Sequence, residues 1–321
     1  MIILLFVLSF VAFVLIELPR GDILDRTIEN LRTRGVQLEM AAIDKLEVRY
    51  GLKLPFYSRY FMWLGNLLQG DMGESFLYGK PVNSLVGQRL ALTASITLLT
   101  LVLTYAISIP IGIYSATHQY SVGDYIFTVF GFIGLATPNF LLALILMFVV
   151  FRYLGWSVGG LFSPEYEFAP WSLGKIVDFL KHLPIPLIVI GTSGTAGLIR
   201  VMRATLLDEL RKAYVVTGRA KGQSERRLLF RYPIRVAINP MVSTIGGLLP
   251  ALVSGATLTS IVISLPTVGP LLLEALQAQD MYLAGSLVML LGGLGMLGTL
   301  ISDLLLVVVD PRIRFERGAQ A

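Results

Sequence analysis

The chain has 321 residues, of which 55% are hydrophobic and only 15% charged, whereas a soluble domain usually carries about a quarter charged residues. This composition excludes an ordinary soluble protein. The net charge of +5 is concentrated in one loop and the C-terminal tail, which favours a role in membrane topology and contact with anionic lipid over nucleic-acid binding. The absence of cysteine excludes disulfides, a thiolate nucleophile and cysteine-ligated metals.

The first apolar run, Ile2 to Ile16, spans 15 residues and could be the core of a signal peptide. No basic residue precedes it, and Glu17 to Arg20 do not form a small-residue cleavage site. We therefore interpret residues 1–17 as a retained first transmembrane helix. Residues 18–89 are too polar for the bilayer and are predicted to form an extracytoplasmic helical cap, with amphipathic helices between Arg26 and Tyr50.

Longer runs without a charge or a histidine follow and predict further spans, since a membrane helix needs about 20 apolar residues. The run of 38 residues is too long for one helix and contains Pro266 and Pro270, so we predict a span to about Ser264 followed by an extracytoplasmic elbow. The sequence thus predicts an all-α polytopic membrane protein with six transmembrane helices and a core at residues 90–309. The runs are Leu90–Thr117 with 28 residues, Tyr125–Phe151 with 27, Leu183–Ile199 with 17, Val236–Leu273 with 38, and Met281–Ser302 with 22, continuing to Val309.

Basic residues near short loops predict the orientation, because lysine and arginine resist translocation. The segment after the fourth span contains ten of them and three acidic residues. We expect this loop, the N-terminus and the tail at 310–321 to be cytoplasmic, and residues 18–89 to lie outside. The ten are Arg200, Arg203, Arg211, Lys212, Arg219, Lys221, Arg226, Arg227, Arg231 and Arg235.

Motifs for catalysis are missing from the sequence. The stretch from Thr217 to Ser224 superficially resembles a phosphate loop, but no Gly-x-x-x-x-Gly-Lys-Ser/Thr frame exists. His118 and His182 fall on opposite sides of the membrane in the predicted topology, so no metal site is expected. Asp303, the one plausible acid within a span, is interpreted as hydrated at the inner interface or packed in the bundle, and no carboxylate pair suggests a proton relay. These absences favour a non-catalytic subunit whose energy comes from another protein, with an ion-coupled transporter working alone as the alternative.

The basic cytoplasmic loop, residues 202–240, is the expected contact for such a partner. Leu206 to Ala220 has helical composition, Gly222 interrupts it, and Ser224 is placed to cap a second helix whose first turn carries Glu225. Two short helices hinged at a glycine are consistent with a docking element or with a merely structured basic loop.

One predicted span is rich in small and hydroxyl residues. These side chains favour close helix packing, or they line a translocation surface whose weak polar contacts let a polar solute pass. The candidate pathway residues are Ser243, Thr244, Ser254, Thr257, Thr259 and Ser260.

The stretch from Tyr214 to Arg227 resembles the "EAA" loop of binding-protein-dependent ABC importer permeases, in the form found in the dipeptide, oligopeptide and nickel branch. Other patterns of that branch occur in the same order along nearly the whole chain. They are Tyr50-Gly51-Leu52 with Pro55 and Tyr60; Gly70-Asp71-Met72-Gly73-Glu74-Ser75 with Pro81-Val82; Thr137-Pro138-Asn139-Phe140; Leu265-Pro266 with Gly269; and Asp310-Pro311-Arg312.

This resemblance implies that residues 212–231 couple the permease to a cytosolic ATPase, with Gly222 as the turn between two helices. Val216 and Gly218 depart from the branch pattern, and a glycine inside a helix costs about 1 kcal/mol relative to alanine, so the first helix is expected to be looser. The implied coupling residues are Tyr214, Val215, Thr217, Gly218, Arg219, Ala220, Lys221, Gly222, Ser224, Glu225, Arg226 and Arg227.

The family also implies the partners and the location. They are two cytosolic ATPase subunits that bind ATP and Mg, a second and different permease chain, an extracytoplasmic solute-binding protein, and the plasma membrane of a bacterium or archaeon. This chain itself is expected to bind no cofactor. Ser260, Thr267 and Pro270 depart from the branch pattern near the elbow, so the resemblance leaves the solute open between oligopeptides and oligosaccharides.

Overall fold

The computed structural model describes residues 2–17, 54–155, 159–167 and 169–309, with the side chains of 2, 16, 248–255 and 309 excepted. The amphipathic helices predicted between Arg26 and Tyr50 and the tail at 310–321 lie outside this part. The described helices are α1 (Ile2–Glu17), α4 (Phe56–Leu68), α5 (Val82–Thr117), α6 (Val122–Ala136), α7 (Asn139–Leu154), α8 (Pro164–Glu167), α9 (Leu173–His182), α10 (Pro184–Leu210), α11 (Ala213–Ala220), α12 (Glu225–Arg231), α13 (Pro233–Ala237), α14 (Asn239–Gly255), α15 (Thr257–Val262), α16 (Val268–Gln277) and α17 (Met281–Val309).

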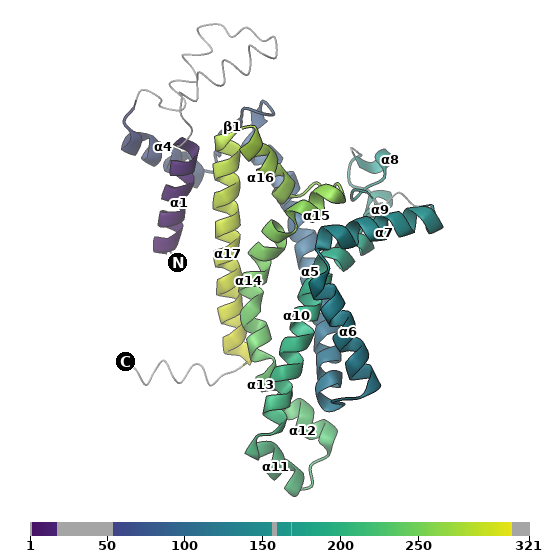
Figure 1. The fold of residues 1–321 in the computed structure, drawn as a ribbon. Coiled ribbons are helices and arrows are strands. Elements are labelled where there is room, and N and C mark those ends of the chain that lie inside the picture. Colours follow the sequence, from purple (N-terminus) through teal and green to yellow (C-terminus); the bar gives the residue numbers. More distant parts are fainter. Residues whose placement is uncertain (1, 18–53, 156–158, 168, 310–321) are drawn as a thin grey trace, which may run out of the picture. The chain divides into compact units, whose positions relative to one another are not determined.

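The chain forms two compact units, the first comprising Met1–Ala91 and Leu271–Gly293, and the second comprising the remainder. Figure 1 draws α5 and α17 as long helices, and by their residue ranges each belongs partly to both units. The two units are described separately below.

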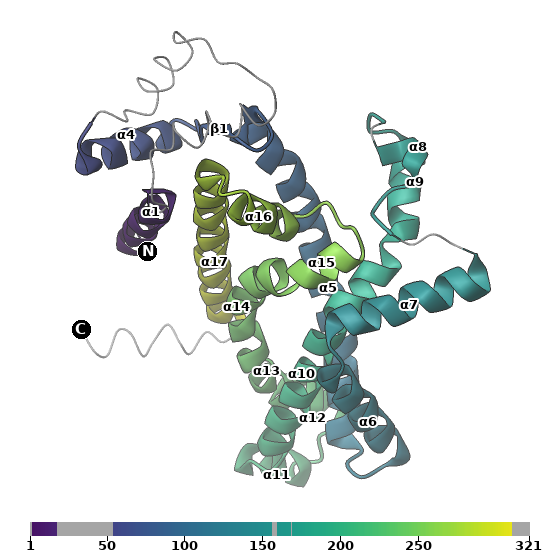
Figure 2. The same cartoon turned by 45° about the horizontal axis from the view of Figure 1, so that its top comes forward.

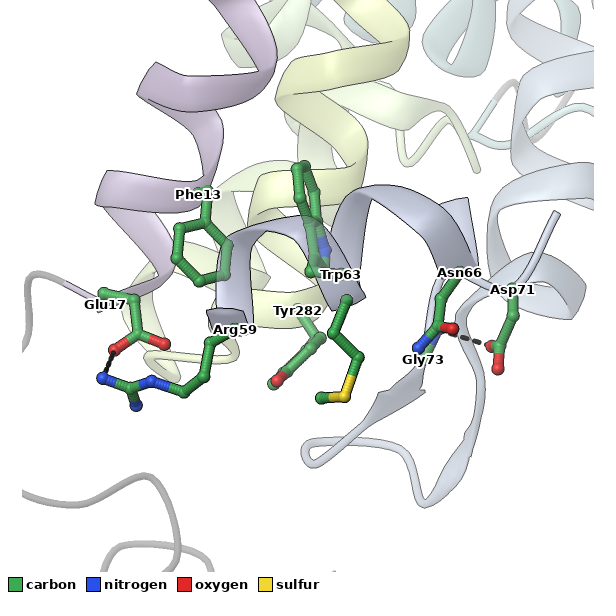
Figure 3. Close-up of a pocket in the computed structure, with 9 residues that line it drawn as sticks. Phe13, Glu17, Arg59, Trp63, Asn66, Asp71, Gly73 and Tyr282 are labelled. Atoms are coloured by element: carbon green, nitrogen blue, oxygen red, sulfur yellow. Dashed lines mark hydrogen bonds and ion pairs between the residues drawn. The ribbon is translucent and has the colours of Figure 1, made fainter. Parts of the chain in front are cut away.

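The first unit has an aromatic core between α1, α4 and α17. Phe13 packs against Tyr60 and Trp63, and the buried Ser9 hydroxyl lies 2.8 Å from the Tyr60 hydroxyl. Beside this core is a cavity of about 20 Å³ (Figure 3), which has room for one water molecule. Arg59 on its wall pairs with Glu17 at 3.0 Å, so α4 is fixed to α1 by ring packing and one ion pair.

A short β-hairpin follows α4, where the sequence predicted only helices. Its strands, β1 (Glu74–Ser75) and β2 (Lys80–Pro81), pair antiparallel. Gly70, Gly73 and Gly79 all have positive φ, a conformation that glycine adopts without steric cost, and this explains why the chain turns here.

The buried carboxylate of Asp280 anchors the hairpin to the start of α17. It accepts hydrogen bonds from the Ser75 hydroxyl at 2.5 Å and from the Leu77 amide at 3.0 Å. Its other oxygen accepts from the Leu283 amide at 3.2 Å, in the manner of a helix N-cap. The phenol of Tyr78 also donates to Glu274 of α16, so side chains at two points hold the hairpin.

Three described helices, α5, α10 and α17, are long and apolar enough to cross a membrane, and a fourth span results if α6 and α7 count together. The chain is therefore a polytopic helical membrane protein. The short apolar helix α1 and the two helices α14 and α15 do not meet this length criterion, so six spans remain a prediction.

The predicted span from Tyr125 to Phe151 is not one straight helix. It breaks after Ala136, and α6 and α7 meet at an angle of 105°. Pro138 has no amide hydrogen and disfavours the helical conformation of the residue before it, and Thr137 is accordingly extended, with ψ of 120°.

The predicted fifth span is also interrupted, because α14 ends at Gly255 and α15 begins at Thr257. A non-helical stretch between α15 and α16 confirms the predicted break around Pro266, while its extracytoplasmic location stays a prediction. Within it, the Leu265 amide donates to the Ser260 carbonyl at 2.7 Å, and Ser264 has φ of +57°.

Polar side chains of α9 hold the segment before α10 together. Asp178 is buried and accepts hydrogen bonds from the Ser163 amide and hydroxyl, both at 2.7 Å. Lys175 is also buried and donates to the Ala169 carbonyl at 2.6 Å, while its ammonium lies 4.7 Å from the centre of the Phe162 ring. Burial disfavours the charged Asp178, but the two hydrogen bonds, together with the nearby charges of His182 and Lys181, outweigh it and hold the pKa of this carboxyl below its ordinary value.

The second unit is built around α10, which packs against α6, α7 and α13. Met202, fully buried at the centre of one core cluster, faces Gly112 of α5. A side chain at Gly112 would lie 2.6 Å from the Met202 Cβ, so the glycine permits the close approach of α5 and α10. Figure 2 shows α10 beside α6 and leading toward α11.

Candidate functional site

The candidate site is the helix pair α11 and α12, which lies at the end of α10 next to α13 (Figures 1 and 2). The sequence predicted one helix from Leu206 to Ala220, but α10 ends at Leu210 and α11 begins at Ala213. Lys212 between them is extended, with ψ of 149°, and this residue redirects the chain into the loop.

Gly222 forms the turn between α11 and α12, as predicted, and has φ of +71°. The Gly222 amide donates to the Arg219 carbonyl at 2.9 Å, and the Gln223 amide donates to the Gly218 carbonyl at 3.2 Å. This pair of bonds is a Schellman motif, in which a left-handed residue after the helix satisfies its last carbonyls. The turn is therefore specified by one glycine.

The two helices share a small core of their own. Val215 of α11 is fully buried, and Leu228 of α12 is 1% exposed. Gly218 is buried as well, and a Cβ there would lie 2.5 Å from the Leu228 Cδ1. The glycine expected to loosen the first helix thus makes room for a leucine of the second.

An ion pair bridges the outer side of the turn. Arg219 reaches Glu225 with Nε to Oε1 at 2.7 Å and Nη2 to Oε2 at 3.2 Å. The hydrogen bonding in this pair lowers the pKa of Glu225 and raises that of Arg219. Because both side chains are exposed, the pair orients the turn without adding much stability.

Tyr214 connects α11 to its flanks. Its phenol donates to Glu209 at 2.6 Å, and its ring packs against Tyr232 with centroids 6.4 Å apart. Ser224 stands at the N-cap position of α12 but makes no side-chain capping hydrogen bond, in contrast to the predicted cap.

The predicted coupling residues thus divide into two groups. Val215 and Gly218 face inward and support the helix pair. The exposed group includes Thr217, whose hydroxyl donates to the Ala213 carbonyl at 2.9 Å and so is already satisfied within its own helix. The outward surface consists of Tyr214, Thr217, Arg219, Ala220, Lys221, Gly222, Ser224, Glu225, Arg226 and Arg227.

The candidate pathway residues do not share one environment. Ser243 is exposed, whereas Thr259 and Ser260 are buried. Thr244 donates to the Met241 carbonyl at 2.7 Å and lies 3.1 Å from the Tyr105 hydroxyl. The list also includes Thr257, which lies against Gly269, and Ser254, whose side chain is outside the described part.

Two polar residues near the C-terminal end of α17 lie in different environments. Asp303 is exposed within this chain, so of the two predicted environments the structure does not support packing inside the chain's own bundle. Its neighbour Ser302 is buried and donates to the Val242 carbonyl of α14 at 2.8 Å.

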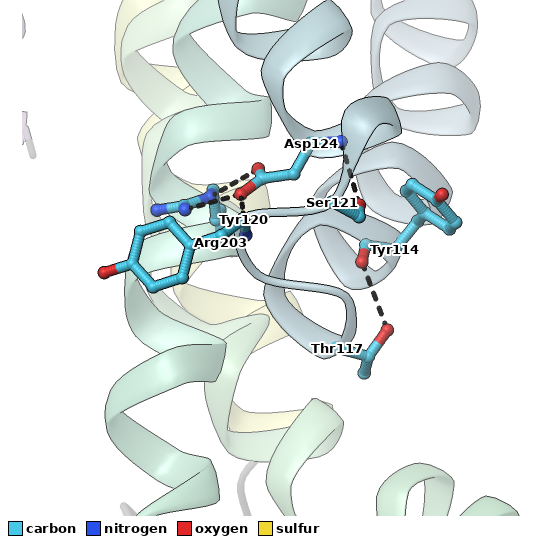
Figure 4. Close-up of polar contacts among 6 residues, drawn as sticks. All are labelled: Tyr114, Thr117, Tyr120, Ser121, Asp124 and Arg203. Atoms are coloured by element: carbon cyan, nitrogen blue, oxygen red, sulfur yellow. Dashed lines mark hydrogen bonds and ion pairs between the residues drawn. The ribbon is translucent and has the colours of Figure 1, made fainter.

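Asp124, which is buried, and Arg203, which is partly exposed, form an ion pair that the sequence did not single out (Figure 4). Arg203 was counted only as one of many basic residues. The available signal was Ser121 three residues before Asp124, because this spacing is typical of a helix N-terminus with an acid in its first turn.

The fold and the helix pair define the class first: this is a polytopic helical membrane protein with a compact helix–turn–helix extension. Residues 108–315 match the family of binding-protein-dependent transport system inner membrane components, and the chain belongs to that family, the permease subunits of ABC importers.

Similar proteins cover nearly the whole chain. The oligopeptide transport system permease AppB of Bacillus subtilis is 34% identical over 96% of this chain and 94% of its own length. The permease YejB of Escherichia coli O157:H7 is 33% identical over 88% of this chain and 78% of its own. The oligopeptide permease OppB of Haemophilus influenzae is 28% identical over 84% of each.

Proposed function

We propose that this chain is the transmembrane permease subunit of an importer that moves oligopeptides inward. It receives them from a solute-binding protein, works with a second, different permease chain and is driven by two separate ATPase subunits. In this proposal six spans place both termini and the α11–α12 pair on the cytoplasmic side of a bacterial or archaeal plasma membrane. The observation that carries the proposal is the compact α11–α12 pair at the end of the long helix α10.

The structure of the pair suits a docking element. The Schellman turn, the Gly218 to Leu228 contact and the Arg219 to Glu225 pair all link α11 to α12, so a force on one helix reaches the other. The Thr205 hydroxyl of α10 donates to the Ala237 carbonyl of α13 at 3.0 Å. This bond links α10, which precedes the α11–α12 pair, to α13, which follows it, so the two ends of the pair are held together.

The solute is proposed from the names of similar proteins. The relatives from B. subtilis and H. influenzae are named for oligopeptide transport, which supports oligopeptides. A relative from Agrobacterium fabrum, 32% identical over 88% of this chain, is named for peptidoglycan transport. This name keeps saccharide-containing solutes as the second candidate, because peptidoglycan contains both sugar and peptide.

The experiment begins with the tagged chain purified in mild detergent from its native host, with co-purifying proteins identified by mass spectrometry. The assembly is then placed in liposomes with its binding protein, and uptake of labelled oligopeptides and oligosaccharides is measured with and without ATP. We expect ATPases and a second permease in the preparation, and ATP-dependent uptake of peptides.

Two results would contradict the proposal. Preferential uptake of oligosaccharides would replace the solute but keep the importer. Uptake by the chain alone, in ATP-free liposomes carrying an ion gradient, would replace the importer with an ion-coupled transporter.

A further inference from the structure

The ion pair between α6 and α10 has two-point geometry. The Arg203 Nε lies 2.9 Å from one Asp124 oxygen, and its Nη2 lies 2.8 Å from the other (Figure 4). Asp124 is 3% exposed. A bidentate contact of this kind fixes the relative orientation of the two groups as well as their distance.

The same carboxylate also supports the turn between α5 and α6. It accepts a hydrogen bond from the Tyr120 amide at 3.0 Å, and Tyr120 has φ of +65°. The Ser121 hydroxyl caps α6 by accepting from the Asp124 amide at 3.2 Å. The start of α6 is thereby defined relative to α5 and, through Arg203, relative to α10.

Stability alone does not explain such a pair. The Asp124 carboxylate is buried, while the Arg203 side chain is 27% exposed. Burying a charge is costly, and replacing a buried ion pair with neutral residues of similar volume is often neutral or stabilising. What an apolar replacement does not reproduce is the fixed orientation of the two helices. The pair is therefore best examined for a role in positioning.

The position of Arg203 along α10 suggests what is being positioned. Leu210, the last residue of α10, lies seven positions further along the helix, which corresponds to about 10 Å. The α11–α12 pair follows directly. On the other side, Asp124 lies in the first turn of α6, and α6 leads through the break at Pro138 into α7.

We propose that Asp124 and Arg203 are positioning residues that make α6 move together with α10 when the α11–α12 pair is displaced. Motion that enters at the cytoplasmic helices then reaches α6, and through it the bent α7, in addition to the span α10 itself. This inference rests on the proposed function, because it requires an ATPase that moves the pair.

The test replaces the pair without leaving a buried charge. In the double variant Asp124→Asn/Arg203→Met, the asparagine oxygen still accepts from the Tyr120 amide, and methionine fills much of the volume of the arginine stem. The single variant Arg203→Lys keeps the charge but loses the bidentate contact. The variants are compared as assembled complexes of equal yield in lipid discs.

Motion is followed by fluorine NMR with an encoded trifluoromethyl-phenylalanine at one of two exposed positions. Val129 reports on α6, and Arg211 reports on the end of α10. The probe for the energised state is Mg·ATP with vanadate. We expect both reporters to shift in the wild type. In the double variant the reporter at Arg211 still shifts, the reporter at Val129 loses most of its shift, and Arg203→Lys lies between.

A covalent link supplies the rescue. A Cβ built at Gly134 of α6 lies 3.7 Å from the Ala196 Cβ of α10, which is close to the mean separation in disulfides of about 3.8 Å. The same Cβ meets the Thr192 Cγ2 at 2.8 Å, so Thr192→Ser accompanies Gly134→Cys and Ala196→Cys. The chain has no other cysteine. Oxidation of this variant should restore the Val129 shift in the absence of the ion pair.

Tyr120→Gly is the matched control, since it eases the left-handed turn and leaves both charged residues in place. It should respond like the wild type. A full Val129 shift in the double variant would overturn the inference, and so would failure of the oxidised disulfide to restore a lost shift. If neither reporter responds in an assembled wild-type complex that hydrolyses ATP, the proposed route through α11–α12 fails instead.

Discussion

The turn at Gly222 offers the most direct test of the α11–α12 pair as a coupling element. Nothing lies within 4 Å of a Cβ built at this position, while its φ is +71°. A substitution therefore acts through backbone conformation alone, without crowding. The free-energy cost of a substitution at Gly222 can therefore be worked out from how readily the new residue adopts positive φ.

An alanine in the left-handed region costs about 1–2 kcal/mol, which lowers the population of this turn about 5- to 30-fold relative to competing conformations. A valine costs more, because a β-branched residue at positive φ is a true outlier. Asparagine is the matched control, since it adopts this region several-fold more often than other residues.

The assay measures ATP hydrolysis and oligopeptide uptake by the assembled complex in liposomes. We expect uptake per ATP hydrolysed to fall in the order wild type, Gly222→Asn, Gly222→Ala, Gly222→Val, while membrane insertion stays constant. Equal ratios for the asparagine and valine variants would refute the conformational reasoning. Wild-type uptake in the valine variant would remove the turn from the coupling mechanism altogether.

Three further predictions concern packing and titration. Gly246→Ala should destabilise the chain by about 1–3 kcal/mol, because the new Cβ would lie 2.9 Å from the Thr299 Cα. Gly247→Ala, where nothing lies within 4 Å of the new Cβ, should be neutral or stabilising. Thermal unfolding in detergent measures both variants. Asp178→Asn should lower the melting temperature at pH 7, and the difference should shrink as the pH falls through the lowered pKa of the wild-type carboxyl; a constant difference would contradict the hydrogen-bond account. Burial and the hydrogen bond to Glu274 raise the pKa of Tyr78 from 10.0 to about 12. The retained proton therefore stabilises the fold up to about pH 10, and this contribution is lost toward pH 12. Tyr78→Phe should remove one late-titrating phenol from the absorbance at 295 nm.

The sequence predicted features that depend on local chemistry. Gly222 could be assigned to a turn because a glycine between two helical stretches, two positions before a serine, has few other roles. The elbow at Pro266 followed from proline in the same way. The break after Ala136 had an equally visible cause in Pro138, but the apolar run across it suggested one span, since hydropathy records burial in lipid and not helix direction.

Other features depended on contacts between distant residues. Asp280 and Ser75 are separated by about two hundred positions, so no local pattern reveals that the acid anchors a hairpin. Helix propensity alone predicted that Gly218 would loosen its helix. The structure shows that this glycine leaves space for Leu228 on the facing helix. In the candidate pathway, hydroxyl residues of one stretch divided between exposed and buried positions because α14 and α15 are separate helices.

The placement of charge in the second unit separates two kinds of ion pair. Arg219 and Glu225 are exposed and six residues apart, so they shape a local turn and tolerate rearrangement when a partner binds. Arg203 and Asp124 are 79 residues apart and the acid is buried, so breaking the pair would leave an uncompensated charge. A loop that docks onto a partner needs an ion pair that can rearrange, whereas two helices that move together need an ion pair that keeps its geometry. The exposed pair lies in the α11–α12 loop, and the pair with the buried acid lies where α6 meets α10. This is the arrangement expected if displacement begins at the loop and is passed on where α6 meets α10.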